Sequence, residues 1–242
     1  MANLVIDIGS LSVKAALADG GQLGKIFRYQ GYKVADFISR IVSGGKVETC
    51  VVSSSGPADP NLIKVLKENC REVILPGDFA GLPVDFGEAS ASLPPDRKAS
   101  IVAASFLFKG RDVMVFDLGS MISVDFVDGK GRYCGGAVSP GLRSRYKAIA
   151  RYSSGLPALD TPDFFIERGM NISESIHSGV NSGIIFEIEG YLQKYPEYLC
   201  VFTGGDAFYF AGKMKRPIFA VCNLVLKGLA LIACHFDFDE TA

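Results

Sequence analysis

The chain has 242 residues, of which 48% are hydrophobic and 21% are charged. This length accommodates two domains of roughly 100 to 130 residues each, and the composition excludes a disordered or fibrous protein. The 25 basic and 26 acidic side chains leave a formal net charge of -1. No global basic field is available to attract nucleic acid or an anionic membrane, so we expect a small-molecule ligand, no nucleic acid and no membrane partner.

Short apolar runs favour a cytoplasmic protein. No stretch approaches the ~20 uninterrupted apolar residues that a membrane helix needs. The N-terminal residues lack a basic segment followed by an apolar core, which disfavours a secretory signal. The six cysteines are scattered without a Cys-x-x-Cys pair, so reduced thiols are favoured over a zinc site or a disulfide framework.

The first half of the chain opens with three strand-like runs. An apolar run that ends at Asp7 is followed by runs at 13–18 and 23–29, which together predict an antiparallel meander. Helical and β-branched patterns then alternate and predict, in order, a helix over 34–42, a strand over 49–53, a helix over 61–69 and a strand over 72–75. Residues 76–95 are rich in Gly, Pro, Ser and Ala and predict a loop before a helical pattern through Phe108.

The second half repeats this opening. Val-Ile-Asp-Ile-Gly-Ser at 5–10 is echoed by Val-Phe-Asp-Leu-Gly-Ser at 115–120, and strand-like runs follow at 122–127 and 132–138. Later patterns predict helices near 141–152 and 173–194, a strand over 198–202, a helix after Gly205, a strand near 217–220 and a helix from Asn223 to about His235. Three antiparallel strands followed by alternating helices and strands form the ribonuclease H-like topology. We therefore predict an α/β protein with two tandem ribonuclease H-like domains, residues 1–110 and 111–242, that enclose a cleft.

Two Asp-x-Gly turns form the first candidate site. Asp7 and Gly9 end the first strand, with Lys14 on the next, and Asp117 and Gly119 repeat the pattern. Such a turn can cradle phosphate oxygens with its backbone N–H groups while the carboxylate holds a cation. A single Asp-x-Gly is also an ordinary turn. Two copies at matched positions of duplicated halves would face each other across one cleft, which favours phosphate binding.

Three further motifs could serve either a ligand or the fold. The two glycines of Thr-Gly-Gly-Asp at 203–206 would let a ligand approach the backbone at the start of a helix, or would form a plain tight turn. Gly-Gly-Ala-Val-Ser-Pro-Gly at 135–141 could cap a helix or serve packing alone. Asp96-Arg97, which follows two prolines, could present its charged side chains to a ligand, or could form a helix N-cap with a solvated arginine.

In this order the motifs resemble the acetate and sugar kinase, heat-shock 70 and actin superfamily, and within it the type III pantothenate kinases. The most specific elements are Asp96-Arg97 and the Pro-Gly after Gly-Gly, and Leu-Lys-Gly-Leu at 226–229 extends the resemblance over nearly the whole chain. The resemblance implies an actin-like ATPase fold and ATP-dependent phosphorylation of pantothenate to 4'-phosphopantothenate, the first step of coenzyme A biosynthesis. It also implies Mg²⁺, a monovalent cation (K⁺ or NH₄⁺) and a homodimer in which the partner chain supplies part of the pantothenate pocket.

The resemblance also implies a role for each motif residue. Asp96 would be the general base on the pantothenate hydroxyl, and Arg97 would bind the substrate carboxylate. Asp117 would hold the monovalent cation, and Ser120 would contact ATP. The other implied ligands of ATP are Asp7, Ile8, Gly9, Ser10, Leu11, Ser12, Val13, Lys14, Gly204 and Gly205, and those of pantothenate are Pro94, Pro95 and Ile172.

Three positions depart from the family pattern. Leu11 replaces a hydroxyl residue of the phosphate loop, Pro94 replaces a glycine, and Ile172 takes the place of a substrate-contacting threonine, unless the neighbouring Ser173 substitutes for it. These changes favour an alternative, a non-catalytic nucleotide-binding or transcription-accessory homologue, whereas the retained charged residues favour the kinase. Another small-alcohol or acid kinase of the superfamily fits the two hairpins but not Asp96-Arg97.

Overall fold

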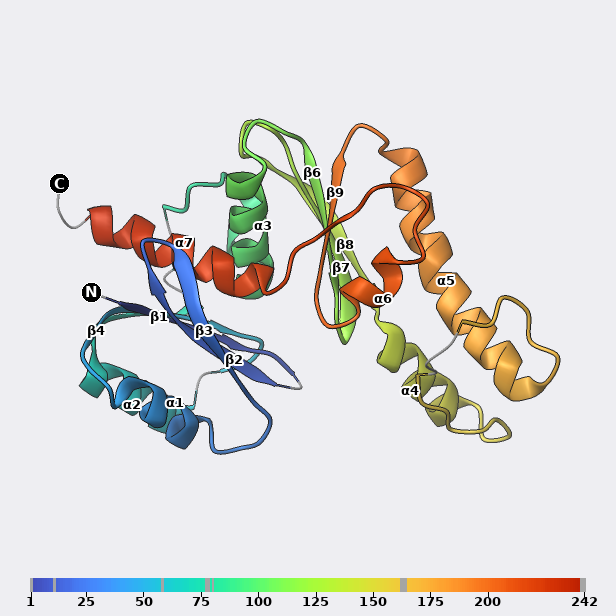
Figure 1. The fold of residues 1–242 in the computed structure, drawn as a ribbon, viewed down its shortest axis with the longest axis horizontal. Helices are drawn as coiled ribbons and strands as arrows, with labels where there is room; N and C mark the ends of the chain where they lie inside the picture. Colours follow the sequence, from blue (N-terminus) through green and yellow to red (C-terminus); the bar gives the residue numbers. More distant parts are fainter. Residues whose placement is uncertain are drawn as a thin grey trace. The chain divides into compact units, whose positions relative to one another are not determined.

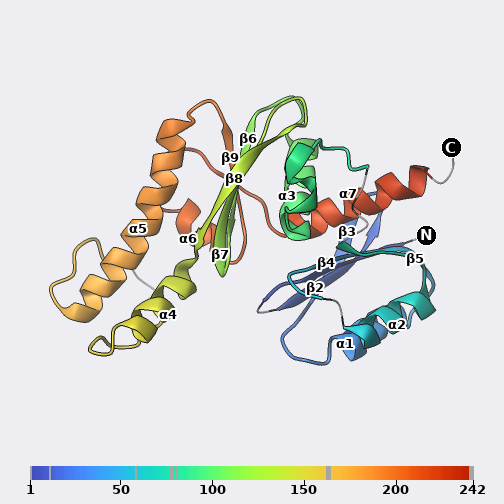
Figure 2. The same ribbon diagram turned by 180° about the vertical axis from the view of Figure 1, so that it is seen from behind.

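The computed structural model describes residues 2–10, 12–57, 59–76, 79, 81–161 and 165–239. The chain divides into two compact units, which are described one at a time (Figures 1 and 2). The first unit holds the chain up to Gly110, the turn Asp128–Tyr133 and the chain from Asn223 onward. The second unit holds Arg111–Val127 and Cys134–Cys222. Within the described residues, no helix is long and apolar enough to cross a bilayer.

A five-stranded sheet of order β3-β2-β1-β4-β5 forms the centre of the first unit. Its strands are β1 (Asn3–Ile8), β2 (Val13–Asp19), β3 (Gln22–Tyr29), β4 (Val47–Ser54) and β5 (Cys70–Ile74). The first three strands pair antiparallel, and the last two run parallel to β1. Because β1 pairs with both β2 and β4, its apolar residues Leu4, Val5 and Ile6 are fully buried.

Helices cover both faces of this sheet (Figures 1 and 2). They are α1 (Val34–Val42) and α2 (Pro60–Asn69) on one face, and α3 (Pro95–Leu107) and α7 (Leu224–Asp239) on the other. The buried residues of α1 and α2 recur at the helical spacing of four and pack with β1 and β4 into one core. A short 3-10 helix, η2 (Gly87–Ala91), lies in the segment that the sequence predicted as a loop.

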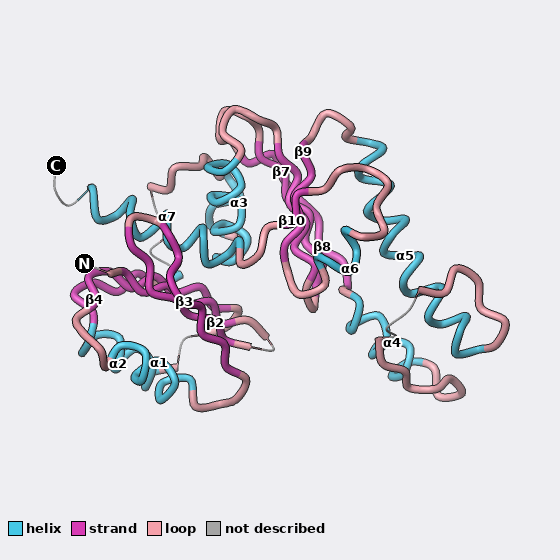
Figure 3. The backbone as a smooth tube through the Cα atoms, in the orientation of Figure 1, coloured by secondary structure: helices cyan, strands magenta, loops and turns pink. Residues whose placement is uncertain are grey.

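The second unit repeats this arrangement in a sheet of order β10-β9-β6-β7-β8 (Figure 3). Its strands are β6 (Val113–Leu118), β7 (Met121–Val127), β8 (Tyr133–Pro140), β9 (Leu199–Thr203) and β10 (Phe219–Ala220). β6 pairs antiparallel with β7 and parallel with β9, as β1 does with β2 and β4. The predicted duplication of a ribonuclease H-like sheet is therefore confirmed.

Three helices accompany the second sheet, α4 (Leu142–Tyr152), α5 (Ile172–Lys194) and α6 (Ala207–Ala211). Phe116 of β6 and Phe202 of β9 pack edge to face, with ring centroids 5.3 Å apart. Ile184 and Ile188 of α5 belong to the same core. Burial of these side chains holds α5 against the sheet, so the start of α5 at Ile172 is positioned by the core.

The last helix belongs to the first unit, which differs from the predicted assignment of residues 111–242 to the second domain. α7 packs against α3 and against β1, β4, β2 and β3. Gly228 permits this close approach, because a Cβ atom there would overlap the backbone of Ala99. The turn Asp128–Tyr133 joins the first unit as well, through a parallel bridge between Asp85 and Arg132. The chain first passes from one unit to the other between Gly110 and Arg111.

Candidate active site

The turn between β1 and β2 carries the first Asp-x-Gly motif. Gly9 N donates to Ser12 O at 3.1 Å and closes the turn, so Gly9 and Ser10 reach solvent. Leu11 lies outside the described residues. The predicted phosphate-loop residues that the structure does describe are Ile8, Gly9, Ser10, Ser12 and Val13, followed by Lys14 on β2. A tight, exposed turn of this kind can present backbone N–H groups to an anion.

Asp7 stands just before this turn, in a charged and mostly buried setting. The strand register places it opposite Lys14 on β2 and Ser53 on β4. Burial raises the pKa of Asp7 to about 6, against the lowering effect of the Lys14 ammonium, and the carboxylate of Asp96 raises it further. Two carboxylates and one ammonium therefore gather in the first unit, and this cluster is short of positive charge.

Two buried hydroxyl groups flank the carboxylates. The Ser53 hydroxyl lies close enough to lower the pKa of Asp7, but it makes no well-formed hydrogen bond to a described residue. Ser100, one helical turn after Asp96 on α3, has the second buried hydroxyl without a partner in the described part of the chain. A buried polar group without a partner costs free energy, so Ser53 beside Asp7 marks a place for a ligand or water.

Asp96 and Arg97 lie in the first turn of α3. The N-cap is Pro94, with Pro95 as the first helical residue, so Asp96 is not the cap that the structural alternative assumed. Asp96 Oδ1 accepts a hydrogen bond from Arg97 N at 2.9 Å. The positive end of the helix dipole also favours a carboxylate at this position. The Arg97 guanidinium donates through Nη2 to Tyr133 Oη at 3.3 Å.

The second Asp-x-Gly turn is closed by the same kind of backbone hydrogen bond, but different side chains lie opposite its carboxylate. Gly119 N donates to Met121 O at 3.1 Å and closes the turn between β6 and β7. The register places Asp117 opposite Ser123 on β7 and Thr203 on β9, both of which are buried. Where the first copy has an ammonium opposite its carboxylate, the second has a hydroxyl. Oxygen donors of this kind suit a hard cation more than a phosphate.

The Thr-Gly-Gly-Asp turn packs directly on this hairpin. Gly204 has a φ of +94°, and a Cβ atom there would lie 2.5 Å from Leu118 O and 2.6 Å from Asp117 Oδ1, so a glycine is required. Asp206 N donates to Leu118 O at 2.9 Å. Around Gly205, by contrast, nothing lies within 4 Å of the Cβ position, which leaves room for a ligand. The predicted turn is therefore both a packing element and an accessible one.

The start of α4 closes the other side of the second hairpin. Gly141 is its N-cap and donates through N to Ser120 O at 3.0 Å, and the Ser144 hydroxyl donates to the same oxygen. A Cβ atom at Gly141 would overlap Gly119 O. The Pro-Gly of the 135–141 motif thus holds Ser120, the residue implied to contact ATP. Ile172 is the first residue of α5, where its side chain is 54% exposed.

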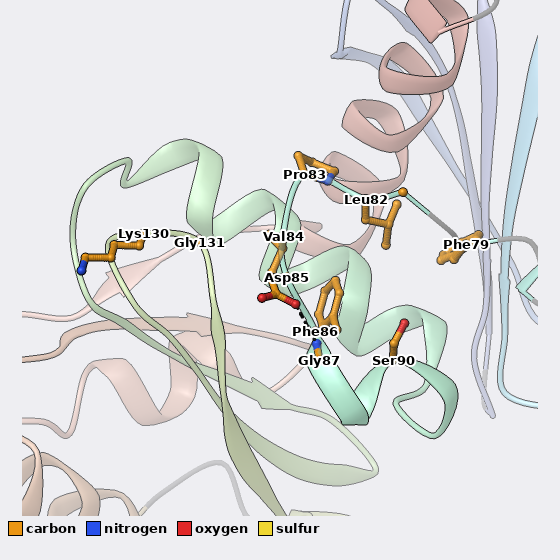
Figure 4. A pocket seen from close by; sticks show the side chains of 11 residues that line it. Phe79, Leu82, Pro83, Val84, Asp85, Phe86, Gly87, Ser90, Lys130 and Gly131 are labelled. Carbon is orange, nitrogen blue, oxygen red and sulfur yellow. Dashed lines mark hydrogen bonds between the residues drawn. The ribbon is translucent and has the colours of Figure 1, made fainter.

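A cavity of about 600 Å³ opens in the first unit, beside the segment that holds Phe79 and residues 81–87 (Figure 4). Lys130 and Gly131 line its other side, and Asp85 Oδ1 accepts a hydrogen bond from Gly87 N at 2.9 Å. No residue of the predicted site lines this cavity. One lining residue, Phe86, packs on Tyr133, with ring centroids 5.9 Å apart, and Tyr133 in turn accepts the hydrogen bond from Arg97.

Comparison with known proteins decides the family. A model of the type III pantothenate kinases matches residues 3–194. The chain belongs to the type III pantothenate kinase family. Family members from Phocaeicola vulgatus and Bacteroides fragilis are each 35% identical to it, over 97% and 94% of this chain and 99% and 95% of their own. The type III pantothenate kinase of Flavobacterium johnsoniae is 30% identical over 94% of this chain and 95% of its own.

Solved structures share the fold of this type III pantothenate kinase family member at low sequence identity. A protein described as a Baf family transcriptional activator from Campylobacter jejuni matches with a TM-score of 0.64, at 21% identity, over 97% of this chain and 99% of its own. A ROK hexokinase from Thermus thermophilus matches with a TM-score of 0.55, at 16% identity, over the full length of both chains. Likeness at these identities shows the fold alone, and it confirms the predicted actin-like ATPase architecture.

Sequence reasoning missed three residues near the motifs. Ser53 reads as an ordinary strand residue, and only the pairing of β1 with β4 brings it to Asp7. Tyr133 contacts Arg97 because the turn before it folds onto the first unit. Lys98 reads as a solvated helix residue, yet it is buried. None of these contacts has a local sequence signal.

Proposed function

We propose that this protein transfers the γ-phosphoryl group of ATP to the 4'-hydroxyl of pantothenate, in the cytoplasm, as the first step of coenzyme A biosynthesis. Beyond family membership, one observation supports the proposal. Asp96 lies close enough to Asp7 to raise its pKa, so the residue implied as the base stands beside the phosphate turn. Phosphoryl transfer depends mainly on positioning and charge neutralisation; this arrangement supports the positioning, and a bound cation would supply the neutralisation.

The surroundings of Asp7 fit a hydrated Mg²⁺. Among the described residues, no group of three or more His, Cys, Asp or Glu side chains forms a metal cage. Mg²⁺ usually binds one or two carboxylates together with phosphate oxygens and water, so Asp7 with the Ser53 hydroxyl is a suitable donor set. When bound, Mg²⁺ neutralises charge on the phosphoryl group. Lys14 adds a fixed positive charge opposite Asp7, which favours the polyphosphate at this turn.

The acceptor hydroxyl is assigned to Asp96. One oxygen of its carboxylate accepts the N–H of Arg97, which orients the group, and the other can accept the proton of a hydroxyl during attack on the γ-phosphorus. Arg97 offers a planar forked donor, suited to the carboxylate at the far end of pantothenate. Pro94 and Pro95 fix the start of the helix, so these two side chains leave a rigid element. Ile172 would add an apolar contact in place of a hydroxyl.

We assign the second hairpin to the nucleotide and to the monovalent cation. Asp117 lies between the hydroxyl residues Ser123 and Thr203 in the strand register, which is an oxygen-donor set that fits K⁺ or NH₄⁺. Ser120 and Gly205 stand at the two turns that meet here, and the open space at Gly205 supports its assignment to ATP. We also infer a homodimer, because α5 exposes Ile172 and Phe186 by 54% and 68%.

A coupled assay tests the function directly. ADP release from Mg·ATP is measured with and without pantothenate, at several K⁺ concentrations and with Na⁺ in place of K⁺. We expect turnover that requires pantothenate and rises with K⁺. A protein that binds ATP but shows no pantothenate-dependent turnover under any of these conditions would favour the non-catalytic homologue. Turnover with a different small alcohol or acid, and none with pantothenate, would favour another kinase of the superfamily.

A further inference from the structure

An ion pair joins three elements of the second unit. Arg145 of α4 binds Glu187 of α5 through Nη2 and Oε2, and Ser139 of β8 donates its hydroxyl to Glu187 Oε1 at 2.6 Å. Only 22% and 23% of the Arg145 and Glu187 side chains are exposed. Charge-assisted hydrogen bonds that are shielded from water in this way are stronger and more directional than a surface ion pair. The pair can therefore fix the positions of the segments that it contacts.

α5 leaves room for the guanidinium of Arg145. Gly183 lies one helical turn before Glu187, on the same face of α5. A Cβ atom at Gly183 would lie 3.3 Å from Arg145 Nη1, so a larger side chain would press on the guanidinium. The glycine leaves the space and the glutamate supplies the charge, which indicates that the two helices are fitted to each other at this arginine.

The same guanidinium holds the segment that packs on the second Asp-x-Gly turn. Arg145 Nε donates to Pro140 O at 2.8 Å. The next residue, Gly141, donates through N to Ser120 O at 3.0 Å, and a Cβ atom there would overlap Gly119 O. A continuous set of contacts therefore runs from the guanidinium through Pro-Gly to the turn that carries Ser120.

We propose that Arg145 and Glu187 are positioning residues, which hold the Pro-Gly segment against the second Asp-x-Gly turn and thereby set the affinity of that turn for ATP and the monovalent cation. This inference rests on the proposed function, in which Ser120 contacts ATP and Asp117 holds the cation. A turn that is fixed before its ligands arrive loses less conformational entropy when they bind. Without the ion pair, binding would have to order the Pro-Gly segment as well, and both affinities would fall.

Two substitutions remove the contact from opposite sides. Glu187→Gln keeps the shape of the side chain and removes its charge, and Arg145→Lys keeps the charge but removes the fork that reaches Glu187 and Pro140 O together. The matched control is Glu189→Gln, two residues further along α5 and on another face of the helix. We expect each of the first two variants to raise the KM for ATP and the K⁺ concentration for half-maximal activity about 10-fold, as the loss of one charge-assisted hydrogen bond would. The KM for pantothenate, and all three constants in the control, should change little.

The double variant tests whether the two residues act through one contact. If they do, Arg145→Lys combined with Glu187→Gln should change these constants little more than either substitution alone. A lower Tm with all three constants unchanged would overturn the proposal, since it would show a contact that serves stability alone. An equal rise in the KM for ATP and the KM for pantothenate would overturn it as well.

Binding of a non-hydrolysable ATP analogue keeps this test separate from the proposed function. Its Kd is measured by calorimetry with Mg²⁺ at several K⁺ concentrations, which requires no turnover. If the wild-type protein binds the analogue but does not phosphorylate pantothenate, the proposed function fails, and a weaker Kd in the two variants still supports the positioning role. An unchanged Kd in both variants overturns that role whatever the activity. Ser139→Ala, which removes only the hydroxyl bonded to Glu187, replaces any variant that does not fold; it should weaken the Kd by a smaller factor, and an unchanged Kd would overturn the role.

Discussion

Asp7 and Asp96 are two carboxylates of one unit with different surroundings. Asp7 ends a central strand, and burial makes its ionisation unfavourable. Asp96 begins a helix, where its carboxylate accepts a backbone N–H and faces the positive end of the helix dipole. A cation bound at Asp7 would remove the repulsion between the two groups. This difference supports the proposed roles, in which Asp7 binds the metal and phosphates and Asp96 accepts the proton.

Asp96→Asn should separate chemistry from nucleotide binding. A positioned general base contributes typically 10²-fold to 10⁴-fold in rate, so pantothenate phosphorylation should fall by about that factor. ATP affinity, measured by calorimetry, should barely change. Asp96 is not the helix cap, and the amide is nearly isosteric with the carboxylate, so we expect α3 to form in the variant. Full activity in this variant would show that Asp96 is not the base. Such a result would mean that the reaction needs little deprotonation of the hydroxyl, as a loose, metaphosphate-like transition state allows.

Asp7→Asn should stabilise the free protein in a pH-dependent way. The pKa of Asp7 is about 6 in the folded state, above that of an unfolded aspartate, so the folded state binds the proton more tightly and loses stability as pH rises from about 4 to 6. Without Mg²⁺ and nucleotide, the variant should gain up to about 3 kcal/mol in unfolding free energy at pH 7.5, and little at pH 4.

Urea unfolding at several pH values measures this gain. The matched control is Asp19→Asn, at the exposed end of β2, which should show no such trend. A gain that is equal at all pH values would mean that Asp7 affects stability through packing and not through its charge.

At the scale of elements, the contact between α3 and α7 decides how the chain divides. A Cβ atom at Gly228 would overlap backbone atoms of Ala99, which no change of side-chain rotamer can relieve. Gly228→Ala should therefore destabilise the protein by about 1 to 3 kcal/mol or more, as overpacking does. Gly190→Ala in α5, where nothing lies within 4 Å of the Cβ position, should instead stabilise it by up to about 1 kcal/mol.

Thermal and urea unfolding of both variants test this contact. Equal stability of the two variants would mean that α7 does not pack against α3 as closely as the structure has it. Because α3 also carries Asp96 and Arg97, we expect Gly228→Ala to reduce turnover as well, whereas Gly190→Ala should leave it unchanged.

Local patterns predicted most elements because turns and periodicity are encoded within short segments. The meander followed from the Gly-rich turns, and the predicted helix over 34–42 matches α1. The strand predicted over 49–53 runs instead over Val47–Ser54, because pairing with β1 and β5 extends it. The location of α7 could not be read from the sequence. An apolar helix with one glycine looks the same whichever unit it covers.

The residues of the candidate site also fall into two groups, those that a short segment of sequence predicts and those that it does not. The two Asp-x-Gly turns and the glycines at 204–205 are local signals, and the structure builds each as a tight turn. The buried hydroxyl of Ser53 depends on strand pairing, and the burial of the Lys98 side chain depends on packing with distant segments such as that of Phe86. Neither has a neighbour in sequence that would mark it. Contacts of this kind form between segments that are far apart in the sequence, so they can be seen only in the folded structure.

At the scale of the molecule, the duplication makes a prediction that neither unit makes alone. Each copy ends its central strand in Asp-x-Gly, and each turn is closed by a backbone hydrogen bond. If one nucleotide serves both copies, its phosphates and its cations must contact both turns.

Hydrogen exchange with a non-hydrolysable ATP analogue and Mg²⁺ tests this prediction. At 100 times its Kd, a ligand stabilises the bound state by about 2.7 kcal/mol, so amides that open only in the free protein should exchange about 100-fold more slowly. We expect this slowing at residues 9–12 and at 118–120 together, with α2 as a reference that changes little. In Asp7→Asn, both segments should lose protection in parallel, because one bound nucleotide protects them. Protection confined to one turn, or loss confined to the turn that carries the substitution, would show that the two copies bind separately.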